Sequence, residues 1–289
     1  MKRRDKIQRI EYLSELERGA KSLLASNSIE ATKLANLTTA QKYSLQNPND
    51  LRQLLFSINT ELDNATTTIY SQVLEQNGRM AEMGINHSSS NIRQDVKVDF
   101  FKTMGTGSTI ASRNATRVLA DGKQLSERIW TSEQRSKIYK LVGESVRAGE
   151  NPFQLAQKIE SYVGEKFPRY MIDRIANTEL IQSYTDGKKE TYGAFLDDYE
   201  DEFKVVVDIE LSPFHPFPDI CDVLEGTYEF GTAPDIPHHP NCICSRTERI
   251  VPVERKVNTK TAQEYIDERS KLIEDKNIYM PKEAGGLVL

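Results

Sequence analysis

Apolar residues near the N-terminus recur at steps of three and four positions, the spacing of one face of an amphipathic helix. This stripe consists of Ile7, Ile10, Leu13, Leu16, Ala20, Leu23 and Leu24. A second stripe begins at Asn49 and Asp50, after Pro48, and is expected to end at Asn77 and Gly78. Its apolar positions are Leu51, Leu54, Leu55, Ile58, Leu62, Ile69 and Val73. The pattern therefore predicts two long N-terminal helices.

The helical pattern is lost between residues 86 and 114, which contain a serine run at 88–90 and the sequence Gly105-Thr106-Gly107-Ser108. Serine and glycine clusters between periodic segments favour turns and loops. We expect a loop-rich passage here, and a domain boundary near residue 120. The glycine-rich sequence lacks the lysine of a phosphate-binding loop, so we interpret it as a connection.

Helix boundary signals are clear beyond residue 120. Thr131 and Gln134 have the spacing of a capping box, and the helix that they predict ends near residue 149. Asn151 and Pro152 supply an N-cap and a first-turn proline for a second helix. A third helix is expected from about Pro168, so three consecutive helices with short turns are predicted.

The periodicity then changes to that of strands. Residues 203–209 and 246–253 form two short runs rich in β-branched residues, and the proline-rich segment between them predicts mostly loop. A short helix is expected from Thr261 to Glu274. The predicted fold is α+β, with a mainly helical N-terminal region, a smaller α+β domain with a short antiparallel sheet and a Cys/His-rich loop, and a helical tail. The expected divisions are 1–120, 121–255 and 256–289.

Composition narrows the class of protein. Charged residues make up 28% of the chain, the net charge is −5, the apolar share is 38% and the mean hydropathy is −0.57. No apolar stretch approaches the roughly 18 to 20 residues of a membrane-spanning helix, and the basic N-terminus is not followed by the apolar core of a signal peptide. We expect a folded chain that is made and kept in a cytoplasm, with no membrane partner.

Chemistry-bearing residues concentrate in one segment. Cys221, Cys242 and Cys244 lie within 30 residues that also contain His215, His238 and His239. Cytosolic conditions keep thiols reduced, so this spacing favours a metal site over disulfides.

Zinc binds about four nitrogen or sulfur donors, often from two short ligand pairs separated by a spacer. The candidate ligands are Cys221, Cys242, Cys244, His239 and His215. The sequence does not decide which histidine completes the set, because His215, His238 and His239 all fit by sequence distance. The alternative is a loop of buried thiols and turns, in which Asp219 and Asp222 cap backbone amides.

Each catalytic interpretation requires a feature that the sequence lacks or does not reveal. A Cys221 nucleophile would need an adjacent histidine and a lowered thiol pKa, and a nuclease of the His-Asn-His type would need a further histidine after His239, which the chain lacks. We expect Glu179 to support the Cys/His loop through hydrogen bonds. The basic start at Lys2, Arg3, Arg4, Lys6 and Arg9 predicts at most weak, non-specific DNA contact.

The segment from Ser212 to Cys244, with its Asp-Ile-Cys-Asp and its closing Pro-His-His-Pro-Asn-Cys-Ile-Cys, resembles the phage head morphogenesis family, the Mu F-like minor head proteins of tailed bacteriophages. The stretch Arg174 to Glu179 is similar to a second family motif, and the resemblance covers roughly residues 125 to 250. Two positions depart from the family pattern: Asn177 stands where many members have arginine, and Pro218 where one branch has a cysteine.

The resemblance implies a minor head protein that associates with the phage portal protein and with capsid or scaffold proteins. It would support head assembly and DNA packaging or ejection, first in the host cytoplasm and then inside the phage head. It implies no catalytic residues. A zinc-dependent hydrolase or nuclease is the alternative function, from a different class.

Overall fold

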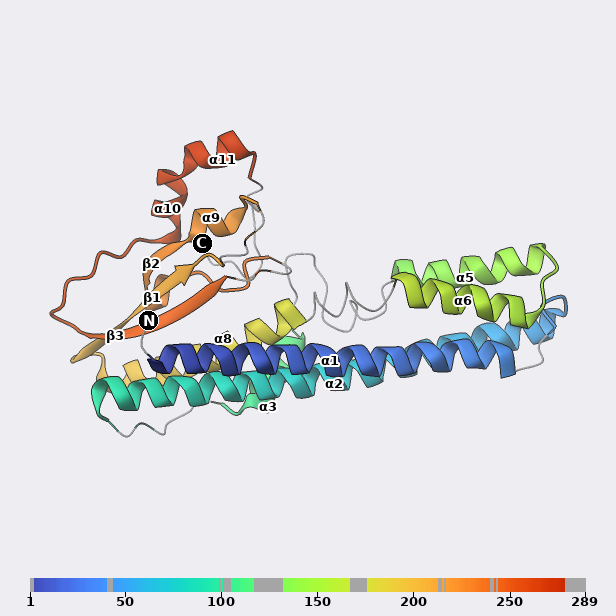
Figure 1. The fold of residues 1–289 in the computed structure, drawn as a ribbon, viewed down its shortest axis with the longest axis horizontal. Helices are drawn as coiled ribbons and strands as arrows, with labels where there is room; N and C mark the ends of the chain where they lie inside the picture. Colours follow the sequence, from blue (N-terminus) through green and yellow to red (C-terminus); the bar gives the residue numbers. More distant parts are fainter. Residues whose placement is uncertain are drawn as a thin grey trace.

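The computed structural model describes residues 3–40, 44–98, 100, 105–116, 132–166, 176–212, 215, 217–239, 242 and 244–278. The chain is mainly helical with one small antiparallel sheet, as expected. Two long helices run side by side along the molecule, and the sheet lies near one end of them (Figure 1). Among the described helices, none combines the length and the apolar character needed to cross a membrane.

The long helices are α1 (Arg3–Ala40) and α2 (Pro48–Val96). The start of α2 is as predicted: the Asn47 side chain accepts hydrogen bonds from the amides of Asn49 and Asp50, and Pro48 occupies the first turn. The predicted stop at Asn77 and Gly78 is wrong, because the helix continues for almost twenty further residues to a left-handed Lys97. Tertiary packing overrides the weak helix propensity of these two residues.

Close helix crossings explain why α2 continues. A Cβ atom on Gly84 would lie 2.1 Å from the carbonyl oxygen of Tyr184, and one on Gly187 would lie 2.1 Å from that of Ala81. The backbones of α2 and α8 (Ile181–Tyr199) therefore touch directly. The missing side chain of Gly84 is what permits this contact.

The expected loop between residues 86 and 114 is also largely absent. Its first part belongs to α2, and its last part forms α3 (Gly107–Thr116). Gly107 packs against α2 so closely that a Cβ atom would lie 2.2 Å from the carbonyl oxygen of Gly78. The glycine-rich sequence starts a packed helix, where a flexible connection was expected.

A helical hairpin packs on the other end of α1 and α2, far from the sheet (Figure 1). It consists of α5 (Ser132–Arg147) and α6 (Pro152–Lys166), both close to their predicted bounds. Asn151 and Gln154 cap α6 reciprocally, each side chain accepting from the other's amide. Thr131, the predicted cap of α5, lies outside the described residues, as do residues 167–175 at the start of the expected third helix. From residue 176 that helix is present, as the π-helical turn η1 (Ala176–Leu180) and then α8.

The sheet has the strand order β2-β1-β3 and is antiparallel throughout. The two predicted strands are confirmed as β1 (Phe203–Glu210) and β3 (Ser245–Pro252), which pair from Phe203 with Pro252 to Glu210 with Ser245. Three short elements interrupt the segment that was expected to be mostly loop. They are α9 (Ile220–Leu224), β2 (Gly226–Glu229) and η2 (Phe230–Thr232).

The predicted tail helix is present but broken into α10 (Ala262–Glu268) and α11 (Ser270–Lys276). The break at Arg269 serves packing: its Nη1 atom donates to the carbonyl oxygens of Asp222, Val223 and Glu225. Arg269 thereby satisfies carbonyls at the end of α9, which a helix of five residues leaves without intrahelical partners.

The helical layer and the sheet share one buried cluster. Ile92 on α2 packs with Tyr192 and Phe195 on α8 and with Val205 on β1. In addition, Lys188 on α8 forms a buried ion pair with Glu248 on β3. Residues on both sides of the expected boundary near 120 thus contribute to this core, and the division into 1–120, 121–255 and 256–289 remains a prediction.

In the first turns of α1, the apolar face that was predicted to be buried is exposed instead. Ile7, Ile10 and Leu13 are 47%, 60% and 51% exposed, although their spacing predicted a buried stripe. Polar residues face α2 in their place: Arg4 pairs with Asp95, Gln8 donates to Asn91, and Glu11 contacts His87. The stripe is buried as predicted further along, at Leu23.

Replacing Gly187 with alanine should lower the free energy of unfolding by at least about 2 kcal/mol, because the new methyl group would collide with the α2 backbone. Gly193→Ala on the same helix is the matched control, since nothing lies within 4 Å of its Cβ position. It should raise the free energy of unfolding by about 0.5 to 1 kcal/mol. Denaturant unfolding of both variants measures these values, and equal effects would contradict the close crossing.

Acid should weaken the fold partly through His87. Burial lowers the pKa of His87 below its usual 6.5, against the opposing effect of Glu11. The unfolded chain therefore binds a proton that the folded chain rejects, and stability falls as the pH drops below about 6.5. In His87→Gln, the loss of unfolding free energy between about pH 7.5 and about pH 5.5 should be smaller than in the wild-type chain. An unchanged loss, measured by denaturant titration at both pH values, would contradict this role.

Candidate metal centre

The first arm of the Cys/His segment is shaped by a capping box at the start of α9. The Asp219 Oδ1 atom accepts from the amide of Cys221 at 2.7 Å, and the Asp222 Oδ2 atom accepts from the amide of Asp219 at 2.8 Å. Both carboxylates cap backbone amides, as expected for aspartate in turns. This capping orients the first turn of α9 and thereby the side chain of Cys221.

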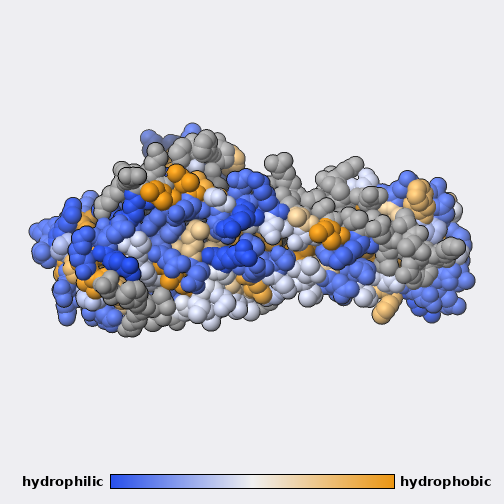
Figure 2. Space-filling model, turned by 60° about the horizontal axis from the view of Figure 1, so that its bottom comes forward, coloured by the Kyte–Doolittle hydropathy of each residue, from blue (hydrophilic) through white to orange (hydrophobic). Residues whose placement is uncertain are grey.

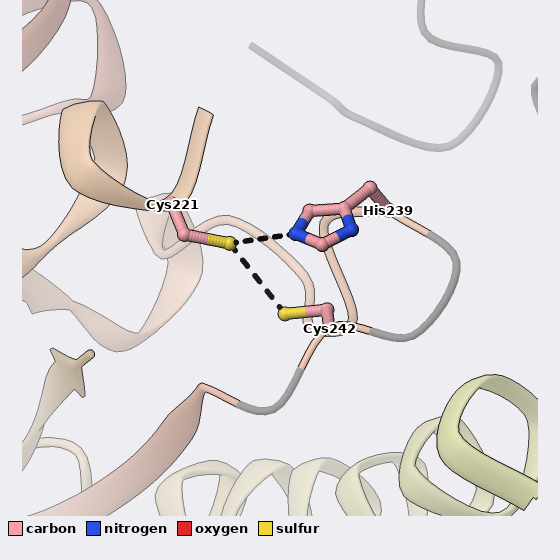
Figure 3. A group of neighbouring side chains, drawn as sticks. All are labelled: Cys221, His239 and Cys242. Carbon is pink, nitrogen blue, oxygen red and sulfur yellow. Dashed lines mark hydrogen bonds between the residues drawn. The ribbon is translucent and has the colours of Figure 1, made fainter. Parts of the chain in front are cut away.

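The second arm brings His239 and Cys242 to the same point. The amide of Cys242 donates to the carbonyl oxygen of His239 at 3.1 Å. The Cys221 Sγ atom lies 3.2 Å from His239 Nε2 and 3.6 Å from Cys242 Sγ. Figure 3 shows these three side chains pointing toward one another from the two arms. The expectation that the distant arms fold back and meet is therefore confirmed for these residues.

The third cysteine lies in the same buried cluster. Cys221, Cys242 and Cys244 are 0%, 1% and 6% exposed and pack together with Leu211. Thiols packed this closely share their protons through hydrogen bonds between the sulfur atoms. Hydrogen bonds from the Cys221 and Cys244 thiols lower the pKa of Cys242, and the same contact with Cys242 raises the pKa of Cys221. Cys242 is therefore the thiol of this cluster that gives up its proton most readily, and the thiolate is the form that binds a cation.

His215 belongs to a neighbouring group of side chains. Its Nε2 atom lies 2.9 Å from Asp222 Oδ2 and 3.5 Å from Asp219 Oδ1. The structure therefore separates His215, a candidate ligand, from the group formed by Cys221, His239 and Cys242. The two groups meet at Asp219, whose Oδ2 atom is 3.1 Å from His239 Nε2. Since His215 and Asp222 both hold the cap of α9, their direct effect is on the position of Cys221.

Two other residues of interest lie close to the cluster. His238 is buried, and burial lowers its pKa, but neither ring nitrogen has a hydrogen-bond partner among the described atoms. Tyr12 of α1 is buried near enough to Cys242 for that thiolate to raise the tyrosine's pKa further, after the larger effect of burial. No pattern in the sequence indicated Tyr12, because it lies off the apolar stripe in a helix distant from the Cys/His segment. Glu179 is buried on η1, and its support of the loop remains a prediction.

The arrangement fits a metal ion chemically. Cys221, His239 and Cys242 each offer one ligand atom, and these atoms all lie within 4.8 Å of one another. Thiolate and imidazole are donors for soft or borderline cations. The group could therefore hold a metal ion, and the buried Cys244 provides a further sulfur beside it.

Comparison with known proteins gave no match to a family model, to a curated protein or to a solved structure.

Metal content should distinguish ligands from supporting residues. Cys221→Ser and Cys242→Ser should each lose the metal of the purified protein, because serine replaces a soft thiolate with a poor ligand. His215→Asn should retain the metal and lose some thermal stability, since it removes only a contact to the α9 cap. Elemental analysis of the three purified variants tests this assignment. Metal loss in His215→Asn alone would place the ligand set elsewhere.

Proposed function

We propose that this chain is a minor head protein of a tailed phage, in which a structural zinc ion clamps the Cys/His lobe. The observation that carries the proposal is the convergence of the two arms that resemble the head morphogenesis family: Cys221 from α9 meets His239 and Cys242 from the second arm. The family resemblance covers this lobe. A lobe that is closed around buried donors is suited to a structural role in the assembly of a phage head. The clamp would join the second, proline-rich arm to α9, whose Ile220 and Leu224 lie in an apolar cluster with Tyr228.

Zinc is the metal that suits these donors best. Structural zinc sites are usually four-coordinate and rich in cysteine. In the proposed set, Cys221, Cys242 and Cys244 supply sulfur and His239 supplies nitrogen.

Burial of the cysteine donors supports a structural role over a hydrolase or nuclease. A catalytic zinc ion keeps one position open for water or substrate. Cys221 and Cys242 are almost completely inaccessible, and the buried Cys244 in the same cluster is a further sulfur donor that would fill the fourth position of a closed site. The proposal therefore assigns no catalytic residue.

The proposed partners are the portal protein and other head proteins, and α1 offers a surface for them. One face of the molecule is mostly hydrophilic with a few separate apolar patches (Figure 2). On α1, the exposed Ile7, Ile10 and Leu13 lie opposite the polar contacts to α2. Exposed apolar groups of this kind are typical of protein contacts. Arg4 is already paired with Asp95, which favours a protein partner over DNA at this end.

Co-expression with the portal protein of the same phage tests the partner. Ile10→Asp should reduce co-purification with portal-containing particles by about tenfold or more, because a charge would be buried in the contact. Phe56→Ser is the control, since Phe56 is 74% exposed on α2 and lies at the other end of the helices. Equal recovery of both variants, or no recovery of the wild-type chain, would contradict the proposed role.

Zinc removal tests the clamp separately. After chelation, the wild-type chain should unfold at a lower temperature and regain its stability when zinc is restored. Metal-dependent DNA cleavage by the folded, zinc-loaded chain would instead favour the nuclease.

A further inference from the structure

A second chemistry-bearing feature lies outside the Cys/His lobe. A cleft of about 660 Å³ opens between the end of α3, the middle of α8 and the turn that follows β2. Five charged side chains and one aromatic ring line it. They are Arg113, Asp186, Lys189, Glu190, Asp235 and Phe230.

The two cations of this cleft are already neutralised. Arg113 Nη1 lies 2.6 Å from Glu190 Oε1, and Lys189 Nζ lies 2.5 Å from Asp235 Oδ1. A third cation adjoins the lining: Arg246 pairs with Glu248 on β3 at 2.9 Å, and its guanidinium lies 5.8 Å from the centre of the Phe230 ring. These pairs leave the third carboxylate of the cleft, Asp186, as its uncompensated charge.

Asp186 is 8% exposed, and it forms no ion pair among the residues that the structure describes. Its side chain has neutral amide partners instead: Gln182 Nε2 donates to Oδ1 at 2.9 Å, and Asn114 also donates a hydrogen bond to the carboxylate. Burial is the main reason that the pKa of Asp186 is raised, and Lys189 opposes it only in part. A buried carboxylate without a cation is costly, so a positive charge brought into the cleft would be favoured.

We propose that this cleft binds a cationic nitrogen group on an aliphatic stem, with Asp186 as its counter-ion and Phe230 beside the stem. Lysine and arginine side chains and free polyamines share this chemistry. Phe230 suits it because an aromatic ring favours both a cation and its methylene groups. The proposal concerns a site apart from the Cys/His lobe, so it stands independently of the proposed head function.

Calorimetric titration of the full chain tests this site with three small probes. N-acetyl-argininamide represents a basic side chain, cadaverine represents a free polyamine, and N-acetyl-norleucinamide is an uncharged control. Binding of either cationic probe, without binding of the control, is expected. Binding of the first alone points to a protein partner, and of the second alone to a polyamine. Binding of neither cation at millimolar concentration, or equal binding of the uncharged probe, would overturn the proposal.

Three variants test the assigned counter-ion. Asp186→Asn should weaken binding of the cation by about tenfold or more, because a charge-assisted hydrogen bond is lost. Asp197→Asn removes the same charge from an exposed position on the same helix and should bind as the wild-type chain does. Lys189→Gln removes a competing cation and should tighten binding. Unchanged affinity in Asp186→Asn, or weaker binding in Lys189→Gln, would overturn the role of Asp186.

Discussion

The contact between the α2 and α8 backbones is the constraint on which the rest of the structure depends. Gly84 and Gly187 allow the two helices to approach until a backbone carbonyl oxygen of each helix fills the place that a side chain would take on the other. From that crossing, α8 leads directly into β1, and β1 is the central strand of the sheet. The buried pair of Lys188 and Glu248 then fixes β3 against the same helix. The helical layer thereby fixes the positions of the two strands between which the Cys/His segment lies.

The metal centre follows a different physical rule. Polar contacts that hold one another order its first arm: Asp219 caps α9, Asp222 caps Asp219, and His215 holds Asp222. These contacts set the position of Cys221 before any cation arrives. Preorganised donors of this kind reduce the entropy that metal binding must overcome.

Local signals in the sequence predicted much of this fold. The start of α2, the hairpin of α5 and α6, and strands β1 and β3 have caps or periodicities that depend on neighbouring residues. The predictions were wrong where contacts between residues far apart in the sequence determine the structure. Gly78 and Gly107 looked like breaks because nothing local shows that they face each other. Ile7 and Ile10 looked buried because a stripe predicts an apolar face, and only the polar partners on α2 reveal which face turns inward.

The candidate site was likewise predicted only as far as local patterns in the sequence allow. Clustering in the sequence identified the cysteines and histidines, but residue spacing could not separate His239, which faces Cys221, from His215, which faces the capping carboxylates. Asp186 was not singled out, because a buried carboxylate without a cation is visible only once its neighbours are placed.

The bond from Arg269 to the end of α9 has a consequence for the order of synthesis. A ribosome makes Cys221, His239 and Cys242 well before it makes Arg269, yet three carbonyls behind Cys221 are satisfied by that one guanidinium. Domains tend to fold from the N-terminus as they emerge. The long helices can thus assemble early, whereas the lobe reaches its final rigidity only when Arg269 has left the exit tunnel.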